Sequence, residues 1–484
     1  MKKKLLSTLL ASTMVAGMLA GCGSSSDSAA PAATQAPAAA TEAATEAPAA
    51  ATEAATEAAT EAPAADEGKV LNIQCWNEEF INRLTDHYPG YEANDASDPT
   101  KGGKIGDVEV KFTITPSDDN AYQNNLDTIL PENANASADD KVDIFLMEAD
   151  YALKYVNSDV TMNLADLGID ADKDLGDQFQ YTKDIVTDAT GNLKGASWQA
   201  CSAGLIYNRA AAKEVLGSDD PADVQEAVKD WDTFNATAAK LKEKGYTITS
   251  SVNDTYRVYS NNVSAPWVQD GKVVIDDNIK KWADDSKALL DAGETNNYEL
   301  WSDDWNKGFY PDGKVFCYFG PAWLINFSMA PDQDGSIAKD GGWGFCVGPQ
   351  SFYWGGTWIA AAAGTDNPTL VKDVILTMTT DQDVLKEIVE KDYDCVNSKS
   401  LLTSLAADDS FGLPVLGGQN PYGELEKGAE NVDMSNISDY DQGCNEEFQT
   451  AMKGFFDGNY KTYDDAVAAF NKAIVEKYPE LTTD

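Results

Sequence analysis

Apolar and polar positions alternate with two different periods along residues 69–484. Short apolar runs of strand length are interleaved with stretches that carry apolar residues at helical spacing. In the first part of this region, strands are predicted at 70–76, 108–114 and 142–147, and helices at 79–88 and 121–130. Strands that alternate with helices in this way predict a parallel α/β sheet.

The same alternation returns after Gly204. Strands are expected at 205–207, 314–319 and 343–347, and helices at 231–244, 277–292, 368–379, 384–389 and 463–474. Asp230 is placed to cap one of these helices, and Gly293 to end another. Because single cores stop growing near about 250–300 residues, a body of this length predicts two α/β lobes. Ligands of open α/β sheets bind beyond the carboxyl ends of the strands, so a cleft is expected there.

The first residues have the pattern of a secretory signal peptide. Lys2, Lys3 and Lys4 precede an apolar stretch, which ends in Leu19-Ala20-Gly21-Cys22. Small residues before a cysteine are typical of bacterial lipoproteins, so we expect 1–21 to be removed and Cys22 to carry a lipid. The alternatives are a signal peptide cut elsewhere or a short membrane anchor. The apolar stretch is shorter than the ~20 residues that a spanning helix needs.

Residues 22–68 are of low complexity, with a recurring Thr-Glu-Ala-Ala unit and scattered prolines. After Cys22 they contain no large apolar residue, so they cannot bury enough surface to offset the loss of chain entropy. This composition predicts a flexible tether between the lipid and the body, which begins near Lys69.

Charge and composition exclude several classes of function. Lys and Arg number 36 against 80 Asp and Glu, a formal net charge of −44 that repels nucleic acid and anionic headgroups and favours a neutral or cationic ligand. The single histidine, His87, rules out histidine triads and His-rich zinc sites and is expected at the surface end of a helix. The chain contains no P-loop, dinucleotide-binding motif or nucleophile elbow. We therefore expect no cofactor, no metal and no catalytic residue.

The body holds six cysteines, at 75, 201, 317, 346, 395 and 444, none in a CxxC pair. Most are flanked by apolar or aromatic residues, which favours buried free thiols. An exported protein with an even number of cysteines can also form disulfides, and the sequence does not choose between these alternatives.

Tryptophans are the most informative side chains. Several of the 11 follow predicted strands or lie in Gly-rich turns: Trp76, Trp198, Trp323, and Trp354 and Trp358 on either side of a Gly-Gly pair. Polar residues follow closely, Asn77 and Glu78 after the first strand and Asp150 after the third. A tryptophan can cover the apolar face of a sugar while amides and carboxylates bond its hydroxyls, so the pattern predicts a saccharide cleft. Burial of each tryptophan in the core is the alternative.

Five sequence blocks resemble the bacterial extracellular solute-binding proteins of family 1, which include maltose-binding protein. They are Asp143-Ile144-Phe145; Gly204 to Arg209; Trp231-Asp232-Thr233-Phe234 with Leu241 to Gly245; Gly313 to Phe316 with Gly320-Pro321-Ala322-Trp323; and Gly355-Gly356 before Trp358. Their order and spacing cover most of the body. The pair Phe316-Cys317 departs from the small residue and methionine of the family, and 404–439 matches nothing in it.

The resemblance implies a two-lobed Venus-flytrap fold with discontinuous lobes joined by hinges near 198–203 and 356–361. Residues 69–200 and 359–403 would form the first lobe, and 201–358 and 404–484 the second. Positions that resemble the family's sugar contacts are Trp76 to Glu78, Asp118, Asp150, Tyr256, Arg257 and Trp323. Trp198, Trp354 and Trp358 complete the predicted site.

The expected function is capture of a mono- or oligosaccharide outside the cell and its delivery to the permease subunits of an ABC importer. The protein would be a monomer, held on the outer face of the cytoplasmic membrane by its lipid alone. The alternatives are a lipoprotein glycosidase, a binding protein for a cation such as a polyamine, and a sensor partner without transport.

Overall fold

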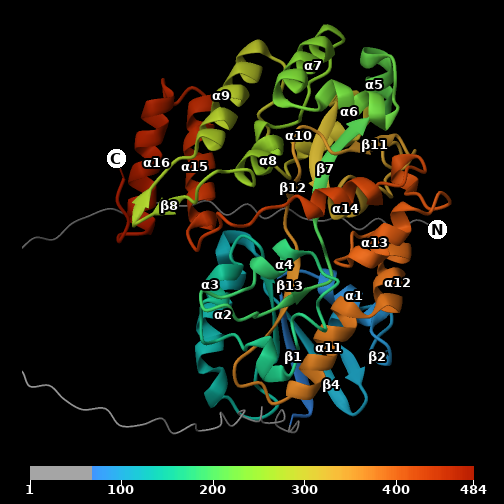
Figure 1. Cartoon of the computed structure of the whole chain (residues 1–484), viewed down its shortest axis with the longest axis vertical. Helices are drawn as coiled ribbons and strands as arrows, with labels where there is room; N and C mark the ends of the chain where they lie inside the picture. Colours follow the sequence, from blue (N-terminus) through green and yellow to red (C-terminus); the bar gives the residue numbers. More distant parts are fainter. Residues whose placement is uncertain (1–67, 484) are drawn as a thin grey trace, which may run out of the picture. The chain divides into compact units, whose positions relative to one another are not determined.

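The computed structural model describes residues 68–483 (Figure 1). They belong to one compact unit. The predicted signal peptide, Cys22 and nearly all of the tether lie outside the described residues. Within 68–483, no helix combines the length and apolar character needed to cross a membrane.

A seven-stranded sheet organises the first lobe, in the order β2-β3-β4-β1-β5-β13-β6. Its strands are β1 (Val70–Cys75), β2 (Tyr91–Ala93), β3 (Gly103–Ile105), β4 (Val108–Ile114), β5 (Ile144–Glu148), β6 (Ala196–Ser197) and β13 (Thr357–Ala361). The strands β1, β4 and β5 pair in parallel, as the alternation with helices predicts. β13 is antiparallel to β5 and places a late segment of the chain beside the early strands.

A four-stranded sheet organises the second lobe. It contains β7 (Ser202–Asn208), β10 (Cys317–Pro321), β11 (Trp343–Cys346) and β12 (Phe352–Tyr353), and a separate two-stranded ribbon contains β8 (Val268–Gln269) and β9 (Lys272–Val273). All three partners of β7 run antiparallel to it, so the expectation of a second parallel sheet is wrong. Strand and helix periodicity identifies elements along the chain, but it does not determine the direction in which distant strands pair.

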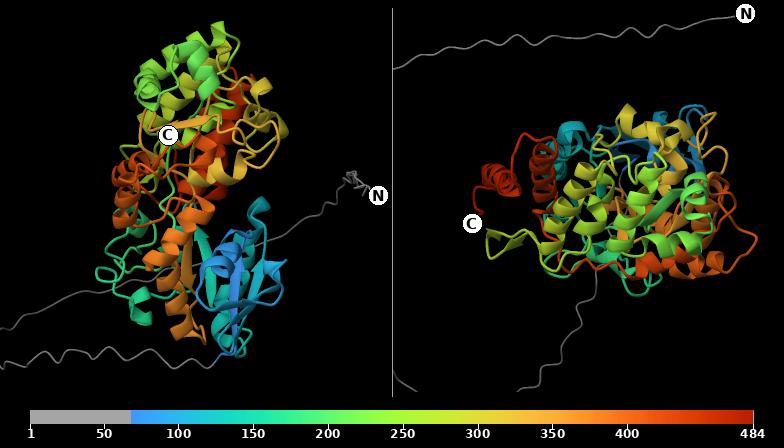
Figure 2. Two further views of the ribbon diagram at one scale, coloured as in Figure 1. Left: turned by 90° about the vertical axis from the view of Figure 1, so that its right-hand side faces the viewer. Right: turned by 90° about the horizontal axis from the view of Figure 1, so that it is seen from above.

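Helices cover both sheets (Figure 2). The first lobe has α1 (Glu79–His87), α2 (Ala121–Ile129), α3 (Ala152–Val156), α4 (Gln180–Asp184), α11 (Pro368–Thr380) and α12 (Gln382–Asp392). The second has α5 (Arg209–Leu216), α6 (Pro221–Val228), α7 (Trp231–Glu243), α8 (Tyr256–Ser260), α9 (Asp277–Ala292), α10 (Asp303–Asn306), α15 (Asp441–Phe456) and α16 (Tyr463–Lys477). Between them, α13 (Lys399–Ala406) packs on α14 (Tyr422–Glu430), which lies along β7.

The caps expected from the sequence are present. The Asp230 carboxylate accepts the Thr233 amide at 2.7 Å and forms a capping box at the start of α7. Gly293 ends α9 in the left-handed conformation, with a φ of +65°.

Alternate residues of β7 enter two different apolar clusters. Leu205 and Tyr207 face the cluster under α7, α9, α15 and α16, whereas Ile206 faces the cluster that continues into the first lobe. Successive side chains of a strand point to opposite faces, so β7 is buried on both sides. The apolar core therefore continues from one lobe to the other.

Two of the segments that cross between the lobes join the sheets side by side (Figure 1), and the chain crosses a third time between α12 and α15. The first lies between β6 and β7, and the second between β12 and β13. Gly356, in the second, has a φ of +108°, and a Cβ there would lie 3.0 Å from the Trp358 ring and 3.4 Å from the Cys201 sulfur. The chain therefore bends tightly at Gly355-Gly356. The predicted boundary between the segments 201–358 and 359–403 falls inside β13. The division of the chain into lobe segments stays a prediction.

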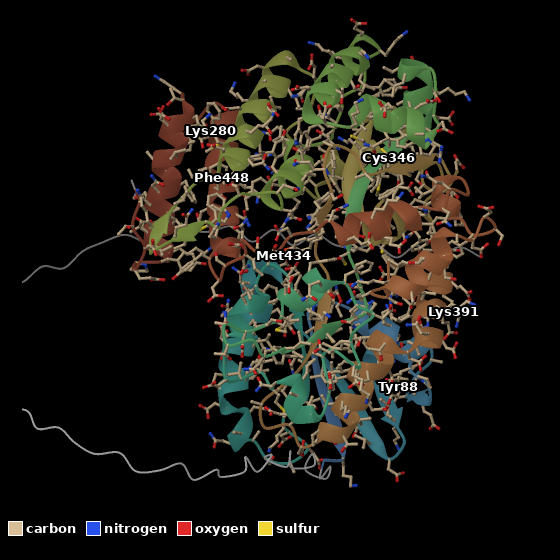
Figure 3. The ribbon with its side chains drawn as sticks, viewed as in Figure 1. Tyr88, Lys280, Cys346, Lys391, Met434 and Phe448 are labelled. Carbon is tan, nitrogen blue, oxygen red and sulfur yellow. The ribbon has the colours of Figure 1, made fainter. Side chains whose placement is uncertain are left out.

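The six cysteines of the described chain are all buried and unpaired. Of the two alternatives left open by the sequence, free thiols and disulfides, the structure therefore has free thiols. Cys346, for example, lies inside the second lobe on β11 (Figure 3). Burial raises the pKa of the thiols of Cys346, Cys395 and Cys444 to about 12. They are packed as small apolar side chains rather than as reactive thiolates.

His87 lies at the end of α1, as expected, but the expectation of a surface position is wrong. Its side chain is only 1% exposed, and its Nε2 lies 2.7 Å from Asp392. Arg83, one turn earlier, lies 3.1 Å from the same carboxylate. The carboxylate belongs to α12, about 300 residues later, so no local pattern revealed this partner.

Candidate ligand-binding site

A cavity of about 590 Å³ lies between the two lobes and is lined by residues from both. This volume is within the range of about 300–1,000 Å³ that small-molecule sites occupy. Its first-lobe wall lies at the carboxyl ends of β1 and β5, where the parallel strands place the segments that follow them. Its second-lobe wall is built mainly from aromatic side chains.

Trp76, Asn77 and Glu78 line the first-lobe wall, directly after β1. The half-buried Trp76 indole rests edge-on against Tyr122, with ring centroids 5.5 Å apart, and against Tyr151 at 6.4 Å. These contacts fix the orientation of the indole, while Asn77 and Glu78 stay exposed at the rim.

Trp323 and Trp354 line the opposite wall. Trp323 comes just after β10, and Trp354 begins the crossing segment that leads to β13. The Trp323 Nε1–H donates to the Trp354 carbonyl at 3.2 Å, and the ring centroids are 5.2 Å apart at 66°. Gly355 lies under the Trp323 ring and has a φ of +71°, so the chain turns closely beneath the indole.

A third indole on this wall was not predicted. Trp301 is 49% exposed, has a φ of +69°, and lies with its ring centroid 6.2 Å from Trp323 and 5.7 Å from Trp354. Its edge packs on Trp305, whose Nε1–H donates to the buried Asp254 carboxylate at 2.8 Å. A left-handed backbone at a bulky residue is strained and persists where the surroundings determine it, often at functional sites. Trp301 lies in an irregular loop, where periodicity carries no information.

Phe327 was missed for a similar reason. It belongs to a π-helical turn, Leu324–Ser328, that directly follows Trp323 and brings both Phe327 and Ser328 to the cavity. Single π-helical turns occur frequently at functional sites. The Arg83 guanidinium of the first lobe lies over the Phe327 ring, 5.3 Å from its centroid.

Two predicted tryptophans pack in the core instead of lining the cavity. Trp198 is 0% exposed and lies against Phe80, with ring centroids 5.6 Å apart. Trp358 is 1% exposed, and its Nε1–H donates to the Thr182 carbonyl at 2.8 Å. Both lie on strand or crossing backbone whose side chains turn inward, so neither is carried into the proposed site.

The structure also places Asp118 and Tyr256 outside this cavity. Asp118 is exposed at the start of a 3₁₀ turn before α2. Tyr256 is buried, and its hydroxyl donates to Asn445 Oδ1 at 2.6 Å. Neither side chain lines the cavity.

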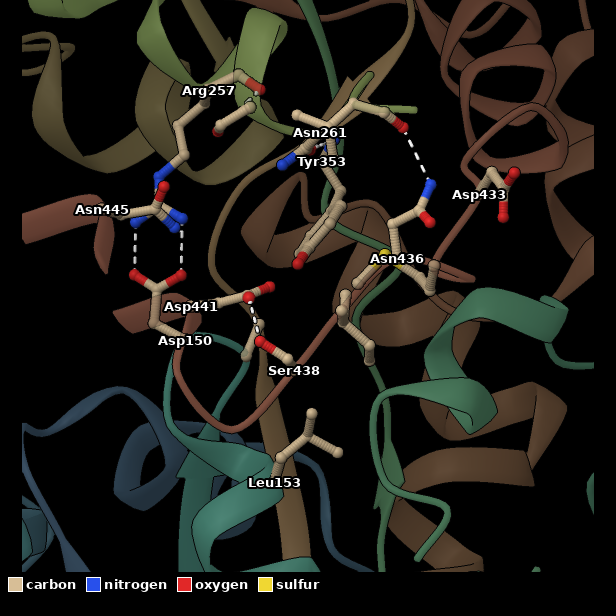
Figure 4. Close-up of a pocket in the computed structure, with 15 residues that line it drawn as sticks. Asp150, Leu153, Arg257, Asn261, Tyr353, Asp433, Asn436, Ser438, Asp441 and Asn445 are labelled. Atoms are coloured by element: carbon tan, nitrogen blue, oxygen red, sulfur yellow. Dashed lines mark hydrogen bonds and ion pairs between the residues drawn. The ribbon is translucent and has the colours of Figure 1, made fainter. Parts of the chain in front are cut away.

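Asp150 and Arg257 meet in a second, much smaller hollow of about 50 Å³ (Figure 4). Arg257 of α8 donates through both terminal nitrogens to the two carboxylate oxygens of Asp150, which follows β5. The pair joins the two lobes and saturates the Asp150 carboxylate. Met434, on the segment between α14 and α15, lines the same hollow at the level where the lobes meet (Figure 3).

Replacing Arg257 by alanine is expected to lower the free energy of unfolding by about 1–3 kcal/mol. The side chains of Arg257 and Asp150 are 21% and 26% exposed, so the variant leaves a partly buried carboxylate without its partner. Denaturant unfolding measures the loss. Lys386→Ala, which breaks an exposed pair with Glu390 within one helix, is the control and should cost a few tenths of a kcal/mol. Equal losses in the two variants would contradict an inter-lobe role.

Two further carboxyls, Glu79 and Glu148, were not predicted and lie deep in the cavity wall. Burial raises the pKa of Glu148 to about 8; the nearby Asp150 carboxylate adds to the rise, and Arg257 opposes it. Burial also raises the pKa of Glu79 to about 7. Glu79 and Glu148 were missed because Thr357, which lies beside both, comes from a strand more than 200 residues later in the chain.

The raised pKa of Glu148 predicts a pH-dependent stability. In the unfolded chain the pKa of a glutamate is about 4.3, so the folded state holds the Glu148 proton more tightly than the unfolded state does. The contribution of this proton to stability is complete below about pH 4 and is lost as the pH rises from about 4.3 through about 8. Between pH 5 and 8, the free energy of unfolding should fall by about 3–4 kcal/mol more in the unaltered protein than in Glu148→Gln. Thermal unfolding of both proteins across this range tests it, and parallel profiles would contradict it.

The sequence profile described as bacterial extracellular solute-binding protein matches residues 100–403, more than half of the chain. The chain belongs to this family. Extracellular function implies that this solute-binding protein is exported. No curated protein matches its sequence.

Solved structures share the fold of this solute-binding protein. A crystal structure titled extracellular solute-binding protein family 1 is 19% identical, with a TM-score of 0.67, and the match covers 84% of this chain and 99% of that one. The ABC transporter-associated binding protein from B. animalis subsp. lactis Bl-04, in complex with β-1,6-galactobiose, is 18% identical, with a TM-score of 0.62 over 86% and 100% of the chains. The galacto-N-biose-/lacto-N-biose I-binding protein from Bifidobacterium longum is 14% identical, with a TM-score of 0.62 over 87% and 100%.

These matches bear out the expected two-lobed α/β fold of the solute-binding proteins. The family consists of binding proteins, and the comparisons give no support to a glycosidase. Within the described chain, no three His, Cys, Asp or Glu side chains are grouped so that they could hold a metal ion.

Proposed function

We propose that the protein captures a mono- or oligosaccharide outside the cell and delivers it to the permease of an ABC importer. The observation that carries the proposal is the cavity between the lobes, where Trp76 faces a wall formed by Trp301, Trp323, Trp354 and Phe327. Flat aromatic faces suit the apolar faces of sugar rings. The amides of Asn77 and Asn82 and the nearby carboxylates suit the hydroxyl rim.

The ligand would bridge the two walls. Trp76, Asn77 and Glu78 belong to the first lobe, and Trp323 and Trp354 lie on or next to the second, so a sugar held by all five favours the closed arrangement. Closure would bend the chain at the two crossing segments, near Cys201 and Gly356. Several solved relatives support the ligand class, since their titles name complexes with galactobiose, lacto-N-biose and maltotetraose.

The finer parts of the proposal concern the membrane. Cys22 would carry a lipid, residues 22–68 would act as the tether, and the closed protein, a monomer, would dock on the permease. The protein itself would perform no chemistry on the sugar. Replacing Cys22 by alanine should release the protein from membranes into the medium, and unchanged membrane retention would argue against lipidation.

A thermal-shift screen against a panel of mono- and oligosaccharides tests the ligand class. A ligand that binds only the native state stabilises it and so raises the melting temperature. At a free ligand concentration of a hundred times Kd, the added stability is about 2.7 kcal/mol. At least one sugar should raise it, without release of reducing ends from an oligosaccharide. A panel without any shift would count against sugar capture, and released reducing ends would favour the glycosidase alternative.

A further inference from the structure

Two carboxyls line the floor of the cavity, those of Glu79 and Glu148. Glu79 is the first residue of α1, shortly after β1, and Glu148 is the last residue of β5. Because β1 and β5 are parallel neighbours, their carboxyl ends lie together. Thr357 is paired with Glu148 across the β5–β13 ladder, and its hydroxyl donates to Glu79 Oε2 at 3.4 Å. Both glutamates therefore lie beside one residue of the cavity wall.

The surroundings of Glu79 do not neutralise it. Gln199 Nε2 donates to Glu79 at 2.7 Å and to Asp394 at 2.9 Å, so one amide is shared by two carboxylates. Arg83 is the nearest cation, but it lies 3.1 Å from Asp392 and 3.7 Å from Asp394. The group as a whole carries more negative than positive charge, which adds to the effect of burial on Glu79.

Glu148 has no cation of its own. Its Oε2 accepts the backbone amide of Asp150 at 2.8 Å, while Arg257 gives both terminal nitrogens to the Asp150 side chain. The other titratable groups that face Glu148 carry no positive charge; they are Tyr151, Tyr353 and Cys201. Of the charged residues that line the cavity, three are glutamates and one is the already paired Arg83.

The walls of the cavity also favour a cation. The faces of Trp76, Trp301, Trp323 and Trp354 carry the negative part of the ring quadrupole, and an ammonium group placed over an indole is attracted to it. The net charge of −44 adds a long-range field that steers cations toward the protein. A neutral sugar would satisfy the hydroxyl-bonding groups but would do nothing to favour the ionised forms of the two floor carboxyls, whereas a bound ammonium group would.

Resting on the proposed function, we propose that the cavity selects a saccharide that carries a protonated amine. Glu79 and Glu148 hold the ammonium group on the cavity floor, and the indoles cover the sugar rings. Charge-assisted hydrogen bonds from the ammonium compensate the two carboxylates at a place where the cations of the chain, Arg83 and Arg257, are paired with other carboxylates. The neutral saccharide with a hydroxyl in place of the amine lacks this interaction.

Isothermal titration calorimetry of the purified full-length exported protein tests the inference with matched pairs. Each amino sugar is compared with the neutral sugar that has a hydroxyl in place of the amine. The pairs are glucosamine with glucose, galactosamine with galactose, mannosamine with mannose, and the β-1,4-linked glucosamine disaccharide with cellobiose. The N-acetylated disaccharide is a further control that keeps the size of the ligand but removes its charge. At least one amine should bind about tenfold or more tightly than its neutral counterparts at pH 7. Its affinity should pass through a maximum with pH, because the carboxyls must be ionised and the amine protonated.

Glu148→Gln should remove the preference for the amine while the neutral counterpart still binds, and Glu132→Gln, at an exposed position outside the cavity, should keep it. Thermal unfolding verifies that both variants are folded. Two outcomes would overturn the inference and leave the proposed function standing. One is that the neutral sugars bind as tightly as the amines or more tightly, and the other is that a neutral sugar binds but no amino sugar does. Binding of spermidine with no sugar of either kind would overturn both.

Discussion

Replacing Trp323 by alanine is expected to weaken saccharide binding by about 5- to 150-fold, or 1–3 kcal/mol. Trp323 offers one indole of the second-lobe wall, packed beside both Trp301 and Trp354, and its Nε1–H is already bonded to the Trp354 carbonyl. The indole is therefore held in place before a ligand arrives, and little entropy is lost when a sugar stacks on it. Calorimetry with a sugar identified in the thermal-shift screen measures the change.

Two further variants separate stacking from damage to the fold. Trp323→Phe keeps a flat aromatic face and should lose less affinity than Trp323→Ala. Tyr463→Ala removes an aromatic ring from α16, outside the cavity, and should leave the affinity unchanged. Unchanged affinity in Trp323→Ala, with a thermal unfolding profile like that of the unaltered protein, would remove Trp323 from the site.

Trp198→Ala is expected to lower the free energy of unfolding by about 3–5 kcal/mol. Its side chain is fully buried next to Phe80, at the start of the first crossing segment. The substitution would leave a large cavity in the core that continues between the lobes, and the close-packed surroundings can collapse into it only in part. Denaturant unfolding measures the loss, and calorimetry on the folded fraction should find the sugar affinity nearly unchanged.

Trp198→Phe is the matched control. The Trp198 Nε1–H has no hydrogen-bond partner within the described chain, so phenylalanine removes volume without breaking a hydrogen bond and should cost much less. A Trp198→Ala variant that keeps its stability but loses sugar affinity would return this residue to the binding site.

Local patterns predicted the elements but not their pairing. The helix at 277–292 was placed to the residue, because an acidic first turn and a glycine beyond the last turn leave little choice for its ends. The antiparallel course of β7 and its partners was not foreseen. It depends on contacts between segments more than 100 residues apart, such as Gly204 with Gly320, and no local propensity records them.

The site was predicted where a side chain follows a strand directly and missed where tertiary packing decides. Trp76, Trp323 and Trp354 line the cavity because strand ends of an α/β fold point to the cleft, and their part in binding stays a prediction. Trp198 and Trp358 sit in equivalent sequence contexts, but there the backbone turns the indole inward, which a sequence does not reveal. Trp301 and Phe327 lie in a loop and a π-helical turn, two conformations without a recognisable periodicity.

The six buried thiols have a consequence for how the protein is made. A chain that folds without cross-links needs no oxidising partner after crossing the membrane, so it can mature in surroundings that lack oxygen. Its melting temperature should be the same with and without dithiothreitol. Since the sulfurs of these six cysteines are enclosed, their exchange with small thiols must wait for an opening of the native packing. The rate at which they are labelled then measures the rate of that opening.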